Sequence, residues 1–405
     1  MSNKNRGIIA VAGFTVMLMI GLTYAWSVFS KSIGAANPEW TKTELSVTFT
    51  IIMVSFCVGS LAAGILSKWV KAKVFMVFAA ILFLAGFFIA SKTDGSPLPL
   101  YLGLGACGAG SGMAYNATMG TVCAWFPDMQ GTISGILLMG FGFSSFIIGK
   151  IFAAVTPSDG STTWCHTFFV LGVIVCIVLL VCAFFMNKPG ADFKPSVPRK
   201  QKTVREPASD IGTAVMIKQP SFWMMYLWTI FISAAGLVLI GQSAGMVVQV
   251  SPNVADGTIA TVAGLISIMN GLGRVVMGMM YDKFGYRITM IFDMICFVIA
   301  GVILLAAIIM GNFGILVAGF VIGGFAYSAV TPMQSAVISD FFGRTHYSSN
   351  LSIVITNLLI ASFASTIAGK LYDITQSYFT ACVMMLVCTI VAFIVSIGVK
   401  KPEAK

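Results

Sequence analysis

Long runs of apolar residues recur along almost the whole chain, and only short polar segments separate them. A helix rises about 1.5 Å per residue, so about 20 apolar residues cross the hydrocarbon core of a bilayer. The runs predict twelve membrane-spanning helices, at residues 7–30, 44–67, 73–91, 98–124, 130–155, 164–186, 221–248, 257–281, 286–310, 313–338, 348–371 and 376–399. We therefore expect an all-α integral membrane protein, because what remains is too short for a separate soluble domain.

Composition and charge support this class. Of the 405 residues, 58% are hydrophobic and 9% are charged, whereas soluble domains carry roughly 25% charged residues. The formal net charge of +10 does not indicate nucleic acid, because most Lys and Arg fall in segments on one side of the predicted membrane. The positive-inside rule then places both termini in the cytoplasm. We expect a multi-pass protein of a bacterial-type cytoplasmic (inner) membrane, with lipid around it.

The polar stretch 187–210, which contains four prolines, divides the chain. It predicts a six-helix half at 1–186, a cytoplasmic linker at 187–218 and a second six-helix half at 219–405. When the chain is shifted by 214 residues against itself, "GILSKWVKAK" at 64–73 falls on "GMMYDKFGYR" at 278–287. This internal repeat predicts two parallel copies related by an axis along the membrane normal.

Arg274 lies inside an apolar run, where a charge is costly. At helical spacing it shares one face with Ser267, Asn270, Gly271, Gly278 and Tyr281, so the arginine faces an interior. Three partners are open: the anion of a substrate, Asp293 on the next predicted helix, or cytoplasmic water reached by snorkelling. A planar guanidinium matches a carboxylate in a bidentate arrangement, which favours the substrate. Asp293 is also the candidate for carrying a coupled proton.

Several motifs together resemble the major facilitator superfamily, and within it the branch of oxalate:formate antiporters and bacterial monocarboxylate transporters. They are "LTYAWSVF" (22–29), "AWFPDMQGTISG" (124–135), "NGLGR" (270–274), the 278–287 loop and "ISDFFG" (338–343). The resemblance implies two pseudo-symmetric halves in a monomer. It also implies a cytoplasmic latch formed by Asp282, Lys283, Gly285 and Arg287, whose first-half copy is degraded, with Lys68 in place of the Asp and Lys71 in place of the Gly.

The resemblance further implies that Arg274 binds the carboxylate and that Tyr24 and Tyr115 help to line the cavity. Oxalate carriers place a second cation, a lysine, at the position that Leu358 occupies here, and one cation suits one carboxylate. Hydrogen-bonding groups inside spans usually face the helix bundle. Trp26, Asn116, Asn270, Tyr327 and Asn357 are therefore further lining candidates, with structural hydrogen bonds or packing as the alternative for each.

Together these features predict a secondary active transporter of small organic monocarboxylates, in the class of lactate, pyruvate and formate. The two halves would rock about a central site, with either proton coupling or anion exchange. The alternatives are an oxalate:formate-type antiporter, an exporter of other organic solutes or drugs, a sensor, and a membrane enzyme. We expect neither an enzyme nor a cofactor or metal, since no catalytic set is evident and the nine cysteines lack ligand spacing. The G-x-G-x-x-G match at 103–108 lies in an apolar run and predicts a small-residue helix face.

Overall fold

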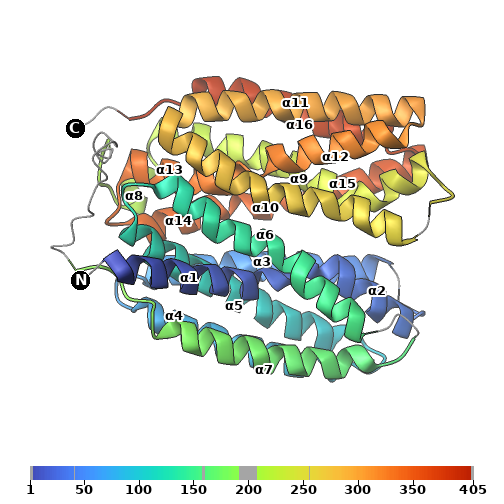
Figure 1. Cartoon of the computed structure of the whole chain (residues 1–405), viewed down its shortest axis with the longest axis horizontal. Coiled ribbons are helices and arrows are strands. Elements are labelled where there is room, and N and C mark those ends of the chain that lie inside the picture. Colours follow the sequence, from blue (N-terminus) through green and yellow to red (C-terminus); the bar gives the residue numbers. More distant parts are fainter. Residues whose placement is uncertain (1–2, 41, 157–159, 191–207, 255, 403–405) are drawn as a thin grey trace. The chain divides into compact units, whose positions relative to one another are not determined.

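The computed structural model describes residues 3–40, 42–156, 160–190, 208–254 and 256–402. Within these ranges the chain is helical and contains no β-strand, as the sequence predicts (Figure 1). The elements are α1 (Asn3–Ile20), η1 (Gly21–Ala25), α2 (Trp26–Ala36), α3 (Lys42–Leu66), α4 (Ala72–Ala90), α5 (Leu98–Trp125), α6 (Gln130–Val155), α7 (Thr163–Ala183), α8 (Thr213–Met216), α9 (Pro220–Val250), α10 (Asp256–Phe284), α11 (Tyr286–Met310), α12 (Phe313–Tyr327), α13 (Val330–Phe342), α14 (Tyr347–Ile355), α15 (Asn357–Thr375) and α16 (Phe379–Gly398).

Nine of the twelve predicted spans are single helices with similar bounds, and three are interrupted. The first span is divided among α1, η1 and α2, the tenth between α12 and α13, and the eleventh between α14 and α15. Among the described residues, ten segments are long and apolar enough to cross a membrane. The protein is therefore a multi-pass membrane protein.

Each interruption has a local cause. At Gly21 an added Cβ would lie 2.5 Å from the carbonyl oxygen of Phe141, so the tightened turn depends on a glycine. The hydroxyl of Ser328 donates to the carbonyl of Phe325, a back-bond that bends helices. The hydroxyl of Thr356 lies 2.8 Å from that of Tyr226, so a tertiary hydrogen bond holds the residue between α14 and α15.

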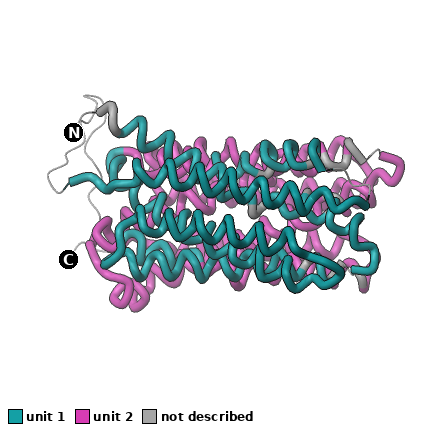
Figure 2. The backbone as a smooth tube through the Cα atoms, turned by 90° about the horizontal axis from the view of Figure 1, so that it is seen from below, with its two compact units in different colours: residues 1–128, 140–204, 347–355 teal, residues 129–139, 205–346, 356–405 magenta. Residues whose placement is uncertain are grey.

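The chain forms two compact units, shown in different colours in Figure 2. Unit 1 contains residues 1–128, 140–204 and 347–355, and unit 2 contains 129–139, 205–346 and 356–405. The predicted halves supply most of each unit. However, the first part of α6 belongs to unit 2 and α14 belongs to unit 1, so each unit incorporates one segment from the other half of the chain.

In unit 1, small residues let α5 pack closely against α3 and α4. A Cβ at Gly112 would lie 1.9 Å from the carbonyl oxygen of Phe56, and one at Gly103 would lie 2.4 Å from that of Gly86. These approaches are closer than any side chain allows, so backbone meets backbone. The prediction of a small-residue helix face at 103–108 is confirmed.

In unit 2, α9 packs on α15 and α16, and α11 packs on α12 and α16. The helix α11 exposes large apolar side chains at helical intervals, at Ile288, Ile295, Ile299 and Val302. Such a stripe is typical of a lipid-facing surface in a membrane protein. Asp293 lies on the opposite, buried face of α11.

Candidate functional site

The α10 helix carries Arg274 on its protein-facing side. Asn270, Gly271 and Gly278 are buried, whereas Leu272, Val276 and Met279 are exposed. Arg274 itself is half-buried. The face predicted from helical spacing therefore packs within unit 2.

The guanidinium of Arg274 has a backbone partner. Its Nη1 donates to the carbonyl oxygen of Leu138 in the first part of α6. A carbonyl is a neutral dipole, so this bond orients the guanidinium without neutralising its charge. Asp293, one of the three partners that the sequence leaves open, does not pair with Arg274: both carboxylate oxygens of Asp293 are buried and accept no hydrogen bond from any residue that the structure describes.

Small residues bring α10 and the start of α6 into direct contact. A Cβ at Gly278 would lie 2.1 Å from the carbonyl oxygen of Gly131, and one at Gly135 would lie 2.3 Å from that of Arg274. Since 131, 135 and 138 are three to four residues apart, they form one face of α6. This contact surface, from Asp282 to Arg274 on α10 and from Gly131 to Leu138 on α6, is called the α10–α6 seam below.

Asp282 closes one end of the α10–α6 seam by capping α6. Its carboxylate accepts hydrogen bonds from the amides of Gly131 (2.9 Å) and Thr132 (2.7 Å) and from the hydroxyl of Thr132 (2.6 Å). The first amides of a helix lack intrahelical partners and carry the positive end of the helix dipole. A carboxylate is therefore well suited to this position.

The other predicted latch residues differ in their roles. Gly285 has φ +85°, a conformation that favours glycine, and it begins α11 directly after α10. Lys283 and Arg287 are exposed, and the ammonium of Lys283 lies 5.0 Å from the centre of the Phe284 ring. Of the four, the structure places Asp282 in the seam and Gly285 at the turn.

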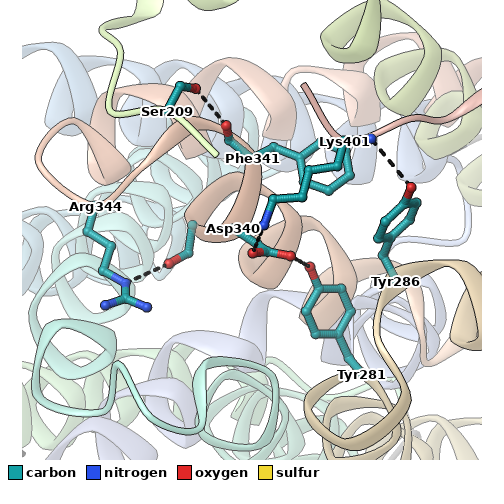
Figure 3. Close-up of polar contacts among 8 residues, drawn as sticks. Ser209, Tyr281, Tyr286, Asp340, Phe341, Arg344 and Lys401 are labelled. Carbon is teal, nitrogen blue, oxygen red and sulfur yellow. Dashed lines mark hydrogen bonds and ion pairs between the residues drawn. The ribbon is translucent and has the colours of Figure 1, made fainter. Parts of the chain in front are cut away.

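A second carboxylate of unit 2, Asp340 on α13, was not among the sequence candidates. Lys401 donates to its Oδ1 at 2.7 Å, and the hydroxyl of Tyr281 donates to its Oδ2 at 3.2 Å (Figure 3). The backbone amide of Lys401 also donates to the hydroxyl of Tyr286. Asp340 thus joins the C-terminal segment to the end of α10, one residue before Asp282. Only the motif "ISDFFG" could have drawn attention to it.

The segment after the predicted linker packs against the same end of α13. The amides of Ala208 and Ile211 donate to the carbonyls of Asp340 and Phe342, and the hydroxyl of Ser209 donates to the carbonyl of Phe341 (Figure 3). This backbone pairing fixes where the described chain re-enters unit 2.

Next to Arg274, α10 approaches the break between α12 and α13. A Cβ at Gly273 would lie 2.3 Å from the hydroxyl oxygen of Ser328, and one at Gly236 would lie 2.0 Å from the ring of Tyr327. Tyr327 is half-buried. Asn270, one turn before Arg274, is 4% exposed, and its Nδ2 has no hydrogen-bond partner among the described residues. Asn270 therefore offers an amide donor one turn before Arg274 on α10.

Asn357 has internal partners for its side-chain amide. Its Nδ2 donates to the carbonyl of Thr229 (3.1 Å) and to the hydroxyl of Ser233 (2.9 Å), and its Oδ1 accepts from Gln334. It is 1% exposed. The structure therefore gives Asn357 a packing role between α9, α13 and α15, and its lining role stays a prediction.

The candidates of unit 1 form a separate group. Tyr115 is buried between the rings of Phe56 and Phe141, whose centres lie 5.5 and 6.1 Å from its own. Trp26 is 6% exposed. Asn116 donates to the carbonyl of Ser348 on α14. The side chain of Tyr24 lies outside the described residues, although its backbone is part of η1.

Comparison with known proteins adds a family and several relatives. The family model described as Major Facilitator Superfamily matches residues 7–255 and 243–405. An oxalate:formate antiporter of Oxalobacter formigenes is 25% identical over 401 residues, which cover 96% of this chain and 90% of that protein. The uncharacterized MFS-type transporter YhjX of Escherichia coli (strain K12) is 23% identical, over 89% of this chain and 86% of its own.

Solved structures show the same fold. The proton:xylose symporter XylE, bound to 6-bromo-6-deoxy-D-glucose, superposes with a TM-score of 0.74 at 13% identity, covering 100% of this chain and 98% of that one. A bacterial homologue of the iron transporter ferroportin, in its outward-facing state, reaches a TM-score of 0.71 at 11% identity, with 96% and 98% covered. At these identities the likeness concerns the fold alone.

Proposed function

Because the chain belongs to the Major Facilitator Superfamily, we propose that it moves small organic monocarboxylates, such as lactate, pyruvate or formate, by alternating access. It is a membrane transporter of that superfamily, and the substrate class is what the proposal adds. We place the termini on the cytoplasmic side of a bacterial-type inner membrane, as the distribution of Lys and Arg predicts.

Arg274 is the observation that carries the proposal. Its guanidinium sits on the protein-facing side of a membrane-spanning helix, where its Nη1 donates to the carbonyl oxygen of Leu138. Asn270 offers an unused amide donor one turn away. A carboxylate bound by a charged fork and an adjacent amide would receive charge-assisted hydrogen bonds, which are the strong kind.

The expected charge of the substrate follows from the number of cations available to bind it. The position that resemblance assigns to a second cation in oxalate carriers holds Leu358 in this chain. A dianion bound to Arg274 would keep one uncompensated charge inside the membrane, which is costly. A monocarboxylate would not. The relative from Oxalobacter formigenes, an oxalate:formate antiporter, makes oxalate exchange the second candidate.

We infer that Asp282 helps to close the cytoplasmic side, as the superfamily's loop motif implies. Its three hydrogen bonds to the start of α6 join a residue of the second half of the chain to one of the first. Any motion that separates α10 from α6 must break them. Substrate binding at Arg274, at the other end of the same seam, would act on the same contact surface.

We further propose that Asp293 carries the proton if transport is proton-coupled. Its carboxyl group is 0% exposed and unpaired within the described residues. Two charged residues of α10, which packs against α11, have hydrogen bonds elsewhere: Arg274 with Leu138 and Asp282 with α6.

Uptake into proteoliposomes tests the substrate class. We expect labelled lactate or pyruvate to accumulate, unlabelled monocarboxylates to compete, and oxalate to compete poorly. Uptake should be lost in Arg274→Ala and retained in Lys370→Ala, which removes one exposed positive charge from the end of α15. Full uptake by Arg274→Ala, or efficient oxalate exchange by the unmodified protein, would refute the monocarboxylate assignment.

The same vesicles test coupling. Asp293→Asn should abolish stimulation by a pH gradient and keep exchange of labelled for unlabelled substrate, because exchange requires no net proton movement. If Asp293→Asn keeps its response to the gradient, Asp293 is not the proton carrier.

A further inference from the structure

Unit 1 contains a cavity of about 490 Å³ that the transport mechanism does not use. Residues of the α3–α4 turn, of α5, of the segment after α7 and of α14 line it. This volume is in the range of small-molecule sites, about 300–1,000 Å³. All of its lining residues belong to unit 1, and Arg274 is not among them.

Three lysines line this cavity: Lys68, Lys71 and Lys188. The ion pairs formed among the described residues are Arg6 with Asp128 and Lys401 with Asp340, so no described carboxylate compensates the three. The cavity therefore has a concentrated positive charge.

The internal repeat allows the charged positions of this cavity to be compared with the corresponding positions of the second copy. With the offset of 214 residues, Lys68 corresponds to Asp282 and Lys71 to Gly285. Where the second copy has a carboxylate that caps a helix, the first copy has an ammonium beside a cavity. Compared with the second copy, the first copy has two lysines in place of an aspartate and a glycine.

Two residues that line the cavity have buried polar atoms without a hydrogen-bond partner among the described residues. Asn116 and Thr121, 1% and 0% exposed, both line it, and Asn116 Oδ1 and Thr121 Oγ1 have no hydrogen-bond partner among the described residues. The orientation of the Asn116 amide is fixed, because its Nδ2 donates to the carbonyl of Ser348 (3.0 Å). Thr121 thus offers a hydroxyl donor and Asn116 an amide acceptor. Buried polar groups without a hydrogen-bond partner are rare and destabilising.

The lysines that line the cavity indicate which class of ligand it binds. Lys binds phosphate as a point charge, whereas carboxylate recognition favours the fork of Arg. Three ammoniums suit a phosphate ester, which carries about −1.5 to −2 charges as a monoester. The acceptor at Asn116 needs an O–H donor, which a hydroxyl of the ligand supplies.

We propose that this cavity binds a phosphate ester that also bears a hydroxyl group, with glycerol phosphate as the simplest form. The phosphate contacts Lys68, Lys71 and Lys188, and the hydroxyl reaches Asn116 and Thr121. Ser348 of α14 also lines the cavity, so an occupied site holds α14 against α3 and α5. The glycerol phosphate is either a soluble ester or the headgroup of an anionic lipid. Trp69, which lines the cavity and is 74% exposed, is a residue typical of the membrane interface.

Thermal unfolding of the purified full chain tests the proposal, since a ligand of the folded state raises its stability by mass action. In nanodiscs of phosphatidylcholine, added glycerol 3-phosphate should raise the unfolding midpoint in a saturable way if the ligand is soluble. In nanodiscs containing phosphatidylglycerol, the midpoint should rise without added ester if the ligand is a headgroup. Either result supports the site, and a failure of both arms overturns it.

Variants locate the response. Lys68→Gln with Lys71→Gln should weaken binding by about tenfold or more, as expected for loss of charge-assisted hydrogen bonds. Thr121→Val should weaken it several-fold while keeping the shape of the side chain. Lys73→Gln, in the same turn but outside the cavity lining, should bind normally. An equal response in the double variant and in Lys73→Gln would show only a general effect of charge and refute the site.

The result is independent of the transport assignment. Arg274→Ala should keep the full response to glycerol phosphate, because Arg274 belongs to unit 2 and does not line the cavity. Loss of carboxylate transport with retained ester binding separates the two proposals. Loss of ester binding in Arg274→Ala would contradict a site built from unit 1 alone.

Discussion

Two contact surfaces of this protein have the same construction and different chemistry. In unit 2, α10 packs on the start of α6 around Gly278. In unit 1, α3 packs on α14 around Gly64, where an added Cβ would lie 2.8 Å from the carbonyl oxygen of Ser348. Gly64 and Gly278 correspond through the repeat. Both surfaces therefore use a glycine where one helix contacts a segment from the other half of the chain.

The polar residues along the two surfaces have diverged. At the first pair of corresponding positions, the α10–α6 seam has Arg274 and the α3–α14 surface has Ser60, which is 0% exposed. At the second pair the residues are Asp282 and Lys68. The α3–α14 surface is held by neutral groups, such as Ser349 donating to the carbonyl of Gly64. Close backbone packing is present in both copies, whereas the charged residues differ: Asp282 caps α6 in the second copy, and the corresponding residue of the first copy is Lys68.

The largest expected effect comes from making the second copy resemble the first. Arg274→Ser should reduce the initial rate of carboxylate uptake by about a hundredfold or more, since a carboxylate loses charge-assisted hydrogen bonds worth about 1.5–3 kcal/mol each. Ser60→Ala, the matched change in the first copy, should alter the rate less than about twofold, since it removes a weak neutral contact. Uptake rates in proteoliposomes, normalised to protein, measure both. Similar losses in the two variants would mean that the copies do not differ in function.

The shared glycines should matter equally in both copies. Gly278→Ala and Gly64→Ala should each lower stability by about 1–3 kcal/mol, because the new methyl group overlaps backbone atoms of the facing segment. Gly264→Ala on α10 is the control, since nothing lies within 4 Å of its added Cβ, and it should be neutral or slightly stabilising. Thermal unfolding in detergent reports the difference. A stable Gly278→Ala variant would show that the close approach of α10 and α6 is dispensable.

The sequence predicts most of the helices and the orientation of α10. Apolar runs of this length have few alternatives in a membrane, and the spacing of Asn270, Gly271, Arg274 and Gly278 directly gives their shared face. The breaks at Ser328 and Thr356 were missed because they depend on local back-bonding and on a tertiary contact with Tyr226. Hydropathy averages over such single residues.

The sequence could not predict which distant segments meet. That residues 129–139 join unit 2 and 347–355 join unit 1 depends on contacts between positions more than a hundred residues apart. The partner of Asp282 follows from those contacts. The pairing of Lys401 with Asp340 joins positions 61 residues apart, which hydropathy and helical spacing do not report either. Helical spacing also could not show that Arg274 and Asp293 do not pair. The two residues lie on consecutive helices, α10 and α11, but the rotation of each helix decides whether their side chains meet.

A smaller effect is expected at the cap of α6. Asp282→Asn removes the charge and keeps a hydrogen-bonding oxygen, so the start of α6 should lose about 1 kcal/mol of stabilisation. Hydrogen exchange of peptides covering 130–138 should become faster, and peptides covering 347–355 in unit 1 should be unchanged. Lys283→Gln, a change in the neighbouring exposed residue, should leave both regions unchanged. Unaltered exchange at 130–138 in Asp282→Asn would show that the charge of Asp282 does not stabilise the start of α6.

The smallest effect concerns the C-terminal segment, which strengthens the α10 end in the second copy. Lys401 pairs with Asp340, whose side chain is 9% exposed, and Asp340 also accepts from Tyr281, next to Asp282. Because the lysine side chain is 33% exposed, Lys401→Gln should cost at most about 1 kcal/mol, and salt should reduce the difference. The exposed neighbour variant Lys400→Gln should cost less. If a double-mutant cycle with Asp340→Asn gives no coupling, the contact does not stabilise unit 2. Measured coupling would mean that the C-terminal segment supports the helix end that carries Asp282.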